Sequence, residues 1–331
     1  MALIQPYGQV RPFSLPAIFI SSGYNEESLK NNKSWKFQED KWNKHMPSTL
    51  PPKIKVKLPG GKDYADVLRI VENNQLHTVC QSARCPNMGQ CWGERTATFM
   101  LLGNLCTRSC RFCAVQFGRP AELDMGEPER VAEAVHTMNL DYAVITSVNR
   151  DDVPDGGASI FAETVRCIRS LQPDCKVELL TPDFCGDMGA LDVVLDAEPD
   201  VLNHNVETAP SLFESIQPWN DWTTSLEVLR HAKNRGFVTK SGLIVGLGET
   251  KQEVMKAIQS IREESGCDIL TIGQYLSPTR RHAKVERMVS EEEFKEYEDY
   301  ATQFGYAACL SGPLVRSSFK AKWAYQAATE K

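Results

Sequence analysis

The sequence lacks any run of apolar residues long enough to cross a membrane as a helix, which takes about 20 residues. Its first residues, MALIQPYGQVRPF, lack the charged start and apolar centre of a secretory signal. Positive charge is not in excess, because the formal net charge is −6. These absences predict a cytoplasmic protein that binds neither a membrane nor a nucleic acid.

Two binding patterns are also missing. Gly246-Leu247-Gly248 lacks the third glycine of a dinucleotide-binding loop. The six histidines show no paired spacing typical of zinc ligands. Cysteine, by contrast, is abundant, with eleven residues among 331. Because thiols stay reduced in the cytoplasm, this abundance indicates metal binding or catalysis rather than disulfide bonds.

Residues 1–60 show little sign of regular structure. They are rich in Pro, Asn and Lys without a sustained period, which predicts an extended N-terminal arm. This segment contains nine Lys and Arg against four Asp and Glu. Its positive charge suits either a solvated arm or a contact surface for an acidic protein partner. A short amphipathic helix is predicted just after it, at 63–73.

From about residue 96, short apolar runs alternate with patterns of helical period. Six runs are predicted as buried parallel strands: 96–103, 142–149, 176–183, 201–207, 238–246 and 268–275. Helices are predicted at 127–138, 158–171, 226–234 and 253–264, and capping boxes predict helix starts at Thr250 and Ser290. The fold class is therefore α/β, a partial (β/α)6 TIM-like barrel whose polar strand ends face the active site.

The first predicted strand leads directly into Cys106-x3-Cys110-x2-Cys113. Three thiolates at this spacing suit one [4Fe–4S] cluster and leave its fourth iron without a protein ligand. That iron can chelate a small molecule, and S-adenosylmethionine (SAM), with its amino and carboxylate groups, is the obvious candidate. A zinc site remains an alternative, although structural zinc usually takes four ligands.

A second triplet, Cys80-x4-Cys85-x5-Cys91, lies just upstream. Its turn-rich stretch, 86–89, could fold around a second cluster with one iron in want of a ligand. Taken alone, this triplet leaves zinc as a fair rival. The other cysteines lack cluster spacing and are expected to be buried free thiols: Cys167, Cys175, Cys185, Cys267 and Cys309.

The stretch CQSARCPNMGQCWGERTATFMLLGNLCTRSCRFCAV resembles the twin-cysteine signature of the lipoyl synthase family, within the radical SAM superfamily. The resemblance covers roughly residues 60–320 and continues through TSVNRDDVPDGGA, ELLTPDF, NHNVET, KSGLIVGLGET and IGQYLSPT to GPLVRSSFKA. One departure occurs in the last segment, where Phe319 stands in place of the family's usual tyrosine. We expect it to be tolerated, because the ring is kept and the two serines and the arginine remain.

The resemblance implies insertion of two sulfur atoms at C6 and C8 of an octanoyl chain that is amide-linked to a lysine of a carrier protein. The implied carriers are lipoyl domains of 2-oxo acid dehydrogenase E2 subunits and the glycine-cleavage H protein. An electron donor such as ferredoxin or flavodoxin is a further implied partner. The implied cofactors are two [4Fe–4S] clusters and SAM, two molecules of which are used per lipoyl group formed.

By the same resemblance, Cys106, Cys110 and Cys113 would bind the SAM cluster. Cys80, Cys85 and Cys91 would bind an auxiliary cluster that supplies the sulfur.

A serine of Arg316-Ser317-Ser318 would be the auxiliary cluster's fourth ligand, with Ser318 the first choice and Ser317 the alternative. We expect Ser318 and Arg316 to act in catalysis, since a serine oxygen matches a cluster iron less well than thiolate and would leave more readily.

The SAM itself has several predicted neighbours. Phe112 would lie near its adenine. The remaining contacts are predicted at strand ends, where each residue could instead cap a helix or brace the barrel rim: Asn149, Arg150, Asn203, Asn205 and Glu207.

Four regions are therefore expected: an arm (1–60), an auxiliary-cluster segment (61–95), a radical SAM barrel (96–285) and a C-terminal helix with the serine segment (286–331). The alternatives are a biotin-synthase-like sulfur inserter and an electron-transfer or structural zinc protein. The upstream triplet and the terminal serines favour the lipoyl synthase family, and a small electron carrier would not need a six-strand barrel.

Overall fold

The computed structural model describes residues 56–330. The predicted arm therefore lies almost wholly outside the described residues, and the four regional boundaries stay predictions. No helix within 56–330 combines the length and the apolar character needed to span a membrane.

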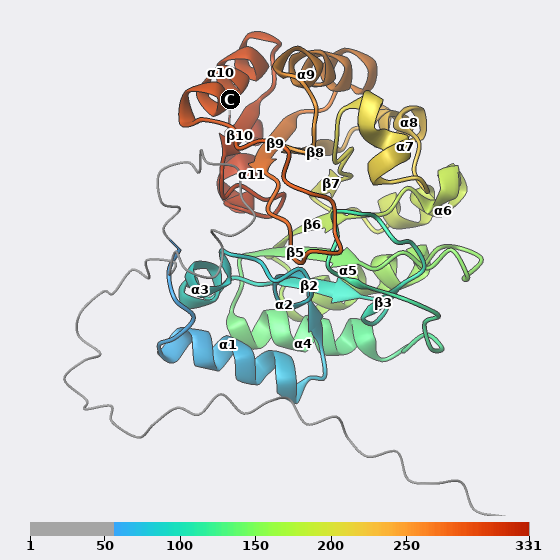
Figure 1. Cartoon of the computed structure of the whole chain (residues 1–331). Helices are drawn as coiled ribbons and strands as arrows, with labels where there is room; N and C mark the ends of the chain where they lie inside the picture. The colour runs from blue at the N-terminus through green and yellow to red at the C-terminus, as the bar shows by residue number, and fades with distance from the viewer. Residues whose placement is uncertain (1–55, 331) are drawn as a thin grey trace, which may run out of the picture. The chain divides into compact units, whose positions relative to one another are not determined.

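The barrel is built from one eight-stranded sheet in the order β1-β2-β5-β6-β7-β8-β9-β10 (Figure 1). Its parallel strands are β2 (Thr98–Leu101), β5 (Tyr142–Ser147), β6 (Lys176–Leu180), β7 (Val201–Asn203), β8 (Val238–Val245), β9 (Ile269–Gln274) and β10 (Ala308–Gly312). β1 (His77–Thr78) pairs antiparallel with β2. Within 56–330 no strand pairing joins β1 to β10, so the barrel is partial.

All six predicted strands are confirmed, and β10 adds a seventh parallel strand that was not predicted. Its sequence, Ala-Cys-Leu-Ser-Gly, contains no β-branched or aromatic residue, so its strand signal is weak. Pairing with β9 over five residues decides its conformation. The barrel therefore has one more parallel strand than expected.

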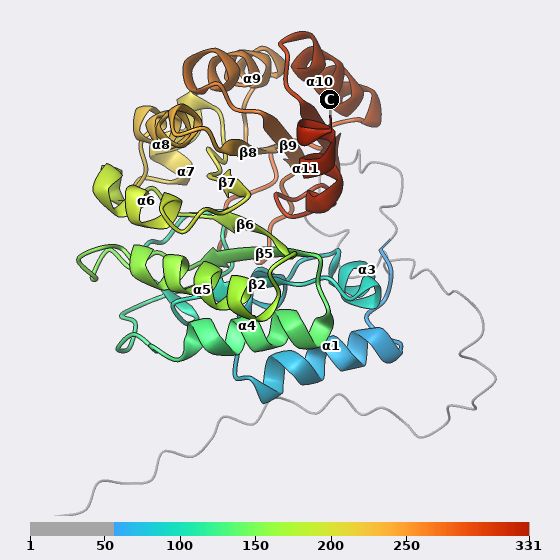
Figure 2. The ribbon, with the colours of Figure 1, turned by 180° about the vertical axis from the view of Figure 1, so that it is seen from behind.

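Helices cover the outer face of the sheet (Figure 2). They are α1 (Lys62–Asn73), α4 (Glu127–Met138), α5 (Ala158–Leu171), α6 (Met188–Leu195), α8 (Trp222–Asn234), α9 (Lys251–Ser265) and α10 (Glu291–Gln303). The helix starts at Thr250 and Ser290 are confirmed, since each side chain accepts the backbone N–H three residues later. Of these seven helices, only α6 was not predicted, because MGALDVVL is apolar on nearly every side.

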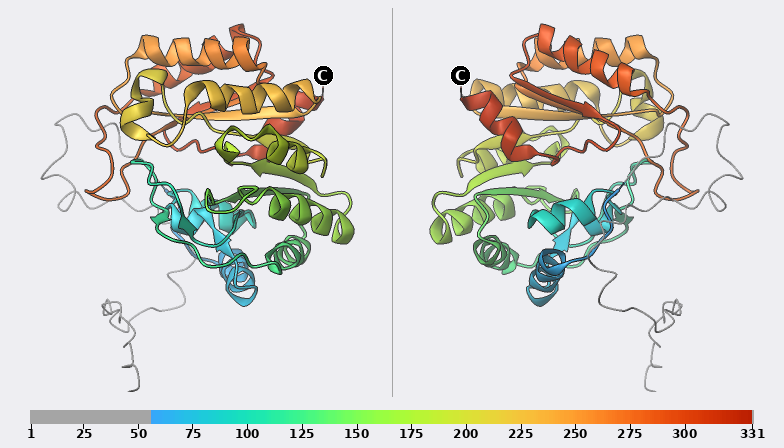
Figure 3. Two further views of the ribbon diagram at one scale, coloured as in Figure 1. Left: turned by 90° about the vertical axis from the view of Figure 1, so that its right-hand side faces the viewer. Right: turned by 90° about the vertical axis from the view of Figure 1, so that its left-hand side faces the viewer.

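The C-terminal helix α11 (Ala321–Thr329) packs on the opposite, inner face of the sheet (Figure 3). Ala321 packs with Tyr142 and Val144 of β5. The residues between and after these two, Ala143 and Ile145, point to the other face, where the outer helices lie. Ala324 packs against Ile269 and Ala308, the first residues of β9 and β10. The chain from β10 to α11 therefore runs through the barrel interior.

A glycine in β9 makes room for that passage. A Cβ atom on Gly273 would lie only 2.1 Å from the carbonyl oxygen of Val315 and 3.1 Å from Arg316 Nη1. No larger residue fits without moving one of the two backbones. The segment 313–318 is thus pressed against the inner face of β9.

Candidate active site

The three cysteines of the downstream triplet, Cys106, Cys110 and Cys113, lie on a loop that contacts the segments following β5 and β9. Cys106 ends β3 (Leu105–Cys106), and its Sγ accepts backbone N–H groups of Arg108 and Asn149, both at 3.4 Å. Burial, followed by the neighbouring thiols and Glu207, raises the pKa of Cys110 to about 12 and that of Cys113 to about 11. The thiols are therefore mutual neighbours that must lose protons when a metal binds.

Arg108 anchors this cysteine loop to the rim of the barrel. Its buried guanidinium bonds to Asp151 after β5 at 2.9 Å and to Asp183 after β6 at 2.7 and 2.8 Å. A third acceptor is Asn220 Oδ1 at 3.1 Å. Paired, charge-assisted bonds of this kind fix both position and orientation. Arg108 was not predicted as a site residue from the sequence. Its position between Cys106 and Cys110, together with the aspartates that follow two predicted strands, could have suggested this role.

The polar residues predicted after β7 line the interior near the same cysteines. Asn203 Nδ2 donates to Glu178 at 2.9 Å, and Asn205 Nδ2 donates to Glu207 at 3.1 Å. The Oδ1 atoms of Asn203 and Asn205 are buried without a partner among residues 56–330. Buried acceptors of this kind need a donor, and the amino and hydroxyl groups of SAM would supply one.

Glu207 has a special backbone and charge state. Its φ of 67° lies in the left-handed region, which a non-glycine residue seldom adopts, so local strain marks this position. Burial raises its pKa to about 7, although the Asn205 hydrogen bond opposes that effect. Its carboxyl group is near enough to contribute to the raised pKa values of Cys110 and Cys113, after burial and the neighbouring thiols.

The other predicted SAM contacts lie in different surroundings. Phe112 packs with Leu247 and Tyr275, at the ends of β8 and β9. The guanidinium of Arg150 is instead engaged by Asp152, at 2.8 and 2.9 Å, and by the Ala121 carbonyl at 2.9 Å. Arg150 is thus held at the rim through its Nε and Nη2 groups, while Phe112 packs against an apolar cluster.

A buried ionic network below these residues was missed from the sequence. Lys240 Nζ donates to both oxygens of Glu178 at 2.8 and 3.1 Å, and both side chains are fully buried. Tyr142 Oη also donates to Glu178, at 2.8 Å. The sequence places Glu178 and Lys240 inside two strands that are predicted to be buried. Because buried charges are rarely left unpaired, these two residues could have been predicted to form an ion pair.

The cysteines of the upstream triplet lie around the short helices α2 (Val79–Ser82) and α3 (Met88–Cys91). Burial first, and then Cys80 and Cys85, raise the pKa of Cys91 to about 12, so the three thiols are close neighbours. The indole of Trp92 lies beside Cys80, and its buried N–H has no nitrogen or oxygen acceptor within 56–330. A cluster sulfur would suit this donor.

The C-terminal segment returns to this loop, as a fourth ligand from Ser317 or Ser318 would require. Asn87 Nδ2 donates to the Leu314 carbonyl at 2.7 Å. Burial raises the pKa of Cys85, and the nearby Arg316 cation opposes part of that effect. Ser317 and Ser318 follow in a half-buried turn. Lys320 Nζ lies 5.6 Å from the centre of the Phe319 ring, a cation–π contact that needs no tyrosine hydroxyl.

Neither triplet forms a mononuclear metal site. Within residues 56–330, no three His, Cys, Asp or Glu side chains converge on a single ion. A [4Fe–4S] cluster takes one thiolate per iron, so its ligands need not meet at one point. All eleven cysteines are free thiols.

The expectation of burial is wrong for two of the five remaining cysteines. Cys175, Cys267 and Cys309 are buried, but Cys167 is half-buried on α5 and Cys185 is exposed. Cys185 has a left-handed φ of 54° in the turn after β6, which holds its side chain out of the core. Its thiol donates to Asp151 at 3.2 Å.

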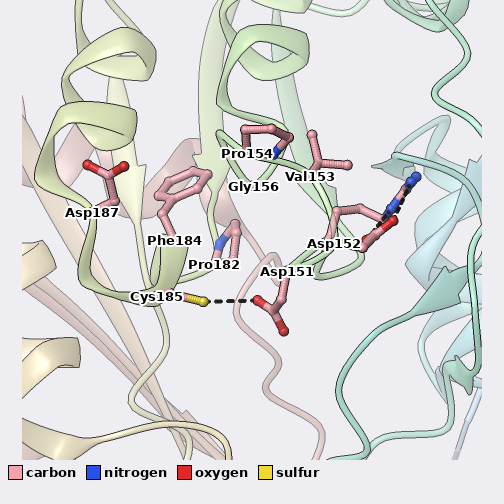
Figure 4. A pocket seen from close by; sticks show the side chains of 10 residues that line it. Asp151, Asp152, Val153, Pro154, Gly156, Pro182, Phe184, Cys185 and Asp187 are labelled. Atoms are coloured by element: carbon pink, nitrogen blue, oxygen red, sulfur yellow. Dashed lines mark hydrogen bonds and ion pairs between the residues drawn. The ribbon is translucent and has the colours of Figure 1, made fainter.

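Cys185 also borders a cavity of about 370 Å³ between the loops that follow β5 and β6 (Figure 4). Asp151, Asp152 and Asp187 contribute carboxylates to its lining, and Phe184 contributes a ring. None of the six cysteines of the two triplets lines it. The cavity adjoins the Arg108 anchor rather than the cysteine loops.

Comparison with known proteins shows which families this chain resembles. The model of the radical SAM superfamily matches residues 100–261, and the model of the N-terminal domain of lipoyl synthase matches residues 17–85. The lipoyl synthase of Rubrobacter xylanophilus is 53% identical over 82% of this chain and 85% of that protein. Those of Chloroflexus aggregans (54%; 82% and 89%) and Mycobacterium ulcerans (51%; 84% and 86%) are similarly related.

Solved structures agree on the fold. Streptococcus suis SuiB bound to S-adenosylmethionine superposes with a TM-score of 0.53 at 9% identity, over 76% of this chain. The match spans only 56% of the SuiB chain. HydG, a maturase of the [FeFe]-hydrogenase, gives a TM-score of 0.52 at 14% identity, over 80% of this chain and 66% of its own. At these identities the likeness concerns the fold alone.

Proposed function

Because the chain belongs to the lipoyl synthase family of radical SAM enzymes, we propose that its two cysteine triplets bind two different [4Fe–4S] clusters. The activity of the chain is that of the family, a sulfurtransferase that forms the lipoyl group. The proposal assigns Cys106, Cys110 and Cys113 to the SAM cluster. It assigns Cys80, Cys85 and Cys91 to the auxiliary cluster.

When bound, the clusters and SAM supply the electron, the hydrogen-abstracting radical and the two sulfur atoms. The chain's own residues hold and orient these groups. Arg108 fixes the Cys106–Cys113 loop to two strand ends through Asp151 and Asp183. Holding reacting groups in one geometry is the main contribution that such a scaffold can make.

We assign SAM recognition to the interior residues whose polar atoms still need partners. Asn203 and Asn205 would accept from the amino or hydroxyl groups of SAM through their free Oδ1 atoms. Glu207 would pair as a carboxylate with a donor of SAM, beside the cysteine loop. Phe112 would pack against the adenine, while Arg150 would brace the rim through Asp152.

At the auxiliary site, we assign Ser318 as the fourth iron ligand, with Ser317 as the alternative. The observation that carries this assignment is the Asn87–Leu314 hydrogen bond, which ties the cysteine loop to the serine segment. Burial raises the pKa of Cys85, and the nearby Arg316 cation offsets part of that rise, which helps to form the thiolate that a cluster needs. Ser318 and Arg316 are thus the residues proposed to control this cluster.

We further propose the carrier substrates and an electron donor as partners. The carriers are octanoylated lipoyl domains of 2-oxo acid dehydrogenase E2 subunits and the glycine-cleavage H protein. The donor is a ferredoxin or a flavodoxin. The family relationship supports all three.

The test uses the enzyme reconstituted without air. About eight irons per chain are expected, four for each cluster. With SAM, dithionite and an octanoyl-lysine peptide, the peptide should gain two sulfur atoms while 5′-deoxyadenosine is released. About four irons and no sulfur insertion in the unaltered chain would contradict the two-cluster assignment.

Paired variants separate the two sites. Replacing Cys80, Cys85 and Cys91 with alanine should remove about half the iron and all sulfur insertion, but leave deoxyadenosine formation. The same replacement of Cys106, Cys110 and Cys113 should abolish both reactions. An identical outcome for the two triple variants would overturn the division of roles.

A further inference from the structure

Positive charge gathers around the loop that carries Cys110 and Cys113. Segments 109–120 and 276–285 contain no Asp or Glu, and their Lys and Arg residues are all exposed: Arg111, Arg119, Arg280, Arg281 and Lys284. The ion pairs found within 56–330 use none of them. In a chain of net charge −6, these two segments form a local cluster of positive charge.

The two basic segments lie directly against each other. The N–H of Ala283 donates to the Arg111 carbonyl at 2.8 Å, and His282 Nε2 lies 3.0 Å from the Cys113 carbonyl oxygen. Figure 1 shows the β9–α10 connection, in orange, crossing the front of the barrel. Its residues 280–284 therefore border the backbone of a proposed cluster ligand. We call Arg111, Arg280, Arg281 and Lys284 the basic rim.

Exposed aromatic side chains accompany the same loop. Trp219 is 58% exposed, and its Nε1 donates to Ser109 Oγ at 3.3 Å. Phe117 is 61% exposed on β4 (Gln116–Phe117), the strand paired with Cys106. Aromatic residues and arginine are enriched at protein interfaces, and tryptophan and arginine often supply much of the binding energy there.

We propose that the basic rim and Trp219 form the docking surface for a small acidic electron-transfer protein that reduces the SAM cluster. This inference rests on the proposed assignment of Cys106, Cys110 and Cys113 to that cluster. One electron leaves the reduced donor and enters the cluster, and no covalent bond forms or breaks. Weak redox encounters of this kind use small interfaces and depend on electrostatic steering.

The position of the rim favours an electron donor over the carrier domain as its partner. An electron needs only close approach to the cluster, and the rim borders the loop holding two of its three ligands. The carrier must instead deliver its acyl chain to the auxiliary cluster as well. Asn87 and Leu314, which connect the two parts of the auxiliary site, lie outside the two segments that carry the basic rim.

The experiment compares two charge-reversed variants of the reconstituted, full-length enzyme. R280E/R281E alters the rim, while R230E/K256E alters exposed residues of α8 and α9 and serves as the control. Each replacement removes one positive charge and adds a negative one, so both variants change the net charge equally. Deoxyadenosine formation is measured with a reduced acidic flavodoxin and, separately, with dithionite, which needs no docking surface.

We expect R280E/R281E to lose about tenfold or more of its flavodoxin-driven rate at low salt, with a smaller loss as salt rises. Its dithionite-driven rate should stay within about twofold of the unaltered enzyme. R230E/K256E should resemble the unaltered enzyme in both assays. W219A should also weaken the flavodoxin reaction alone, through lost apolar contact.

Three results would overturn the inference. One is an equal loss with both reductants, which would mean that the variant damages the cluster loop. Another is no loss with either. The third is a defect in dithionite that appears with an intact octanoylated carrier but not with an octanoyl-lysine peptide, which would make the rim the carrier's surface. Failure of the proposed function itself would show separately, as no product from the unaltered enzyme in dithionite.

Discussion

Asn87 Nδ2 donates a hydrogen bond of 2.7 Å to the carbonyl oxygen of Leu314, joining residues 227 positions apart in the chain. Asn87 is buried in the turn between Cys85 and Cys91, and Leu314 lies two residues before Arg316. The bond therefore fixes the distance between three proposed cluster ligands and the segment that holds the fourth.

Replacing Asn87 with alanine should loosen the auxiliary site selectively. The lost bond leaves a carbonyl unpaired, at a cost of about 1–3 kcal/mol in the free energy of unfolding. We expect lower retention of the auxiliary cluster and reduced sulfur insertion, with deoxyadenosine formation retained. Iron content, product mass and denaturant unfolding measure the three effects.

The chain offers a matched control for that variant. Asn74 Nδ2 also donates to a backbone carbonyl, that of Ile70 at 2.9 Å, but at the end of α1. Asn74→Ala should leave sulfur insertion unchanged. Equal loss of insertion in both variants would mean that general destabilisation, rather than the Asn87–Leu314 link, is responsible.

Gly273→Ala tests the path of the serine segment through the barrel. The new Cβ atom would overlap the Val315 carbonyl oxygen, which lies 2.1 Å from its position. Displacement of the segment should cost about 1–3 kcal/mol of stability and suppress sulfur insertion. Gly312→Ala is the control, since its Cβ would meet the Val315 side chain at an ordinary 3.5 Å. Normal insertion by Gly273→Ala would contradict the importance of this close approach.

Ser318→Cys tests the identity of the fourth ligand. A thiolate binds a cluster iron more firmly than a hydroxyl oxygen, so we expect the auxiliary cluster to be retained while product formation falls. Ser317→Cys should have little effect on either if Ser318 is the ligand. The opposite pattern would identify Ser317 as the fourth ligand. Full activity in both variants would mean that neither serine is the ligand.

Much of the barrel could be predicted because its signals are local. Apolar runs of strand length and amphipathic helices identify six strands and α4 and α5 directly. β10 and α6 escaped for opposite reasons. The first is too poor in β-forming residues, and the second is too apolar to show a polar face.

The site divides in the same way. Cysteine spacing identifies both triplets, because the three cysteines of each triplet lie within one short stretch of the chain. The Lys240–Glu178 pair joins β8 to β6, and Arg108 joins the cysteine loop to Asp183. Such partners are chosen by the three-dimensional fold, so charge in an apolar strand indicates that a partner exists without saying which one.

The raised pKa of Glu207, about 7, predicts a pH-dependent affinity for SAM. Burial penalises the carboxylate, so as the pH falls through 7 the residue takes up a proton and loses the charge that would pair with a donor of SAM. SAM affinity should therefore fall by up to about tenfold per pH unit below 7 and level off above it. Glu207→Gln should bind SAM weakly and without this dependence. Equilibrium SAM binding between pH 6 and 8 measures both, and an equally steep profile in Glu207→Gln would assign the titration to another group.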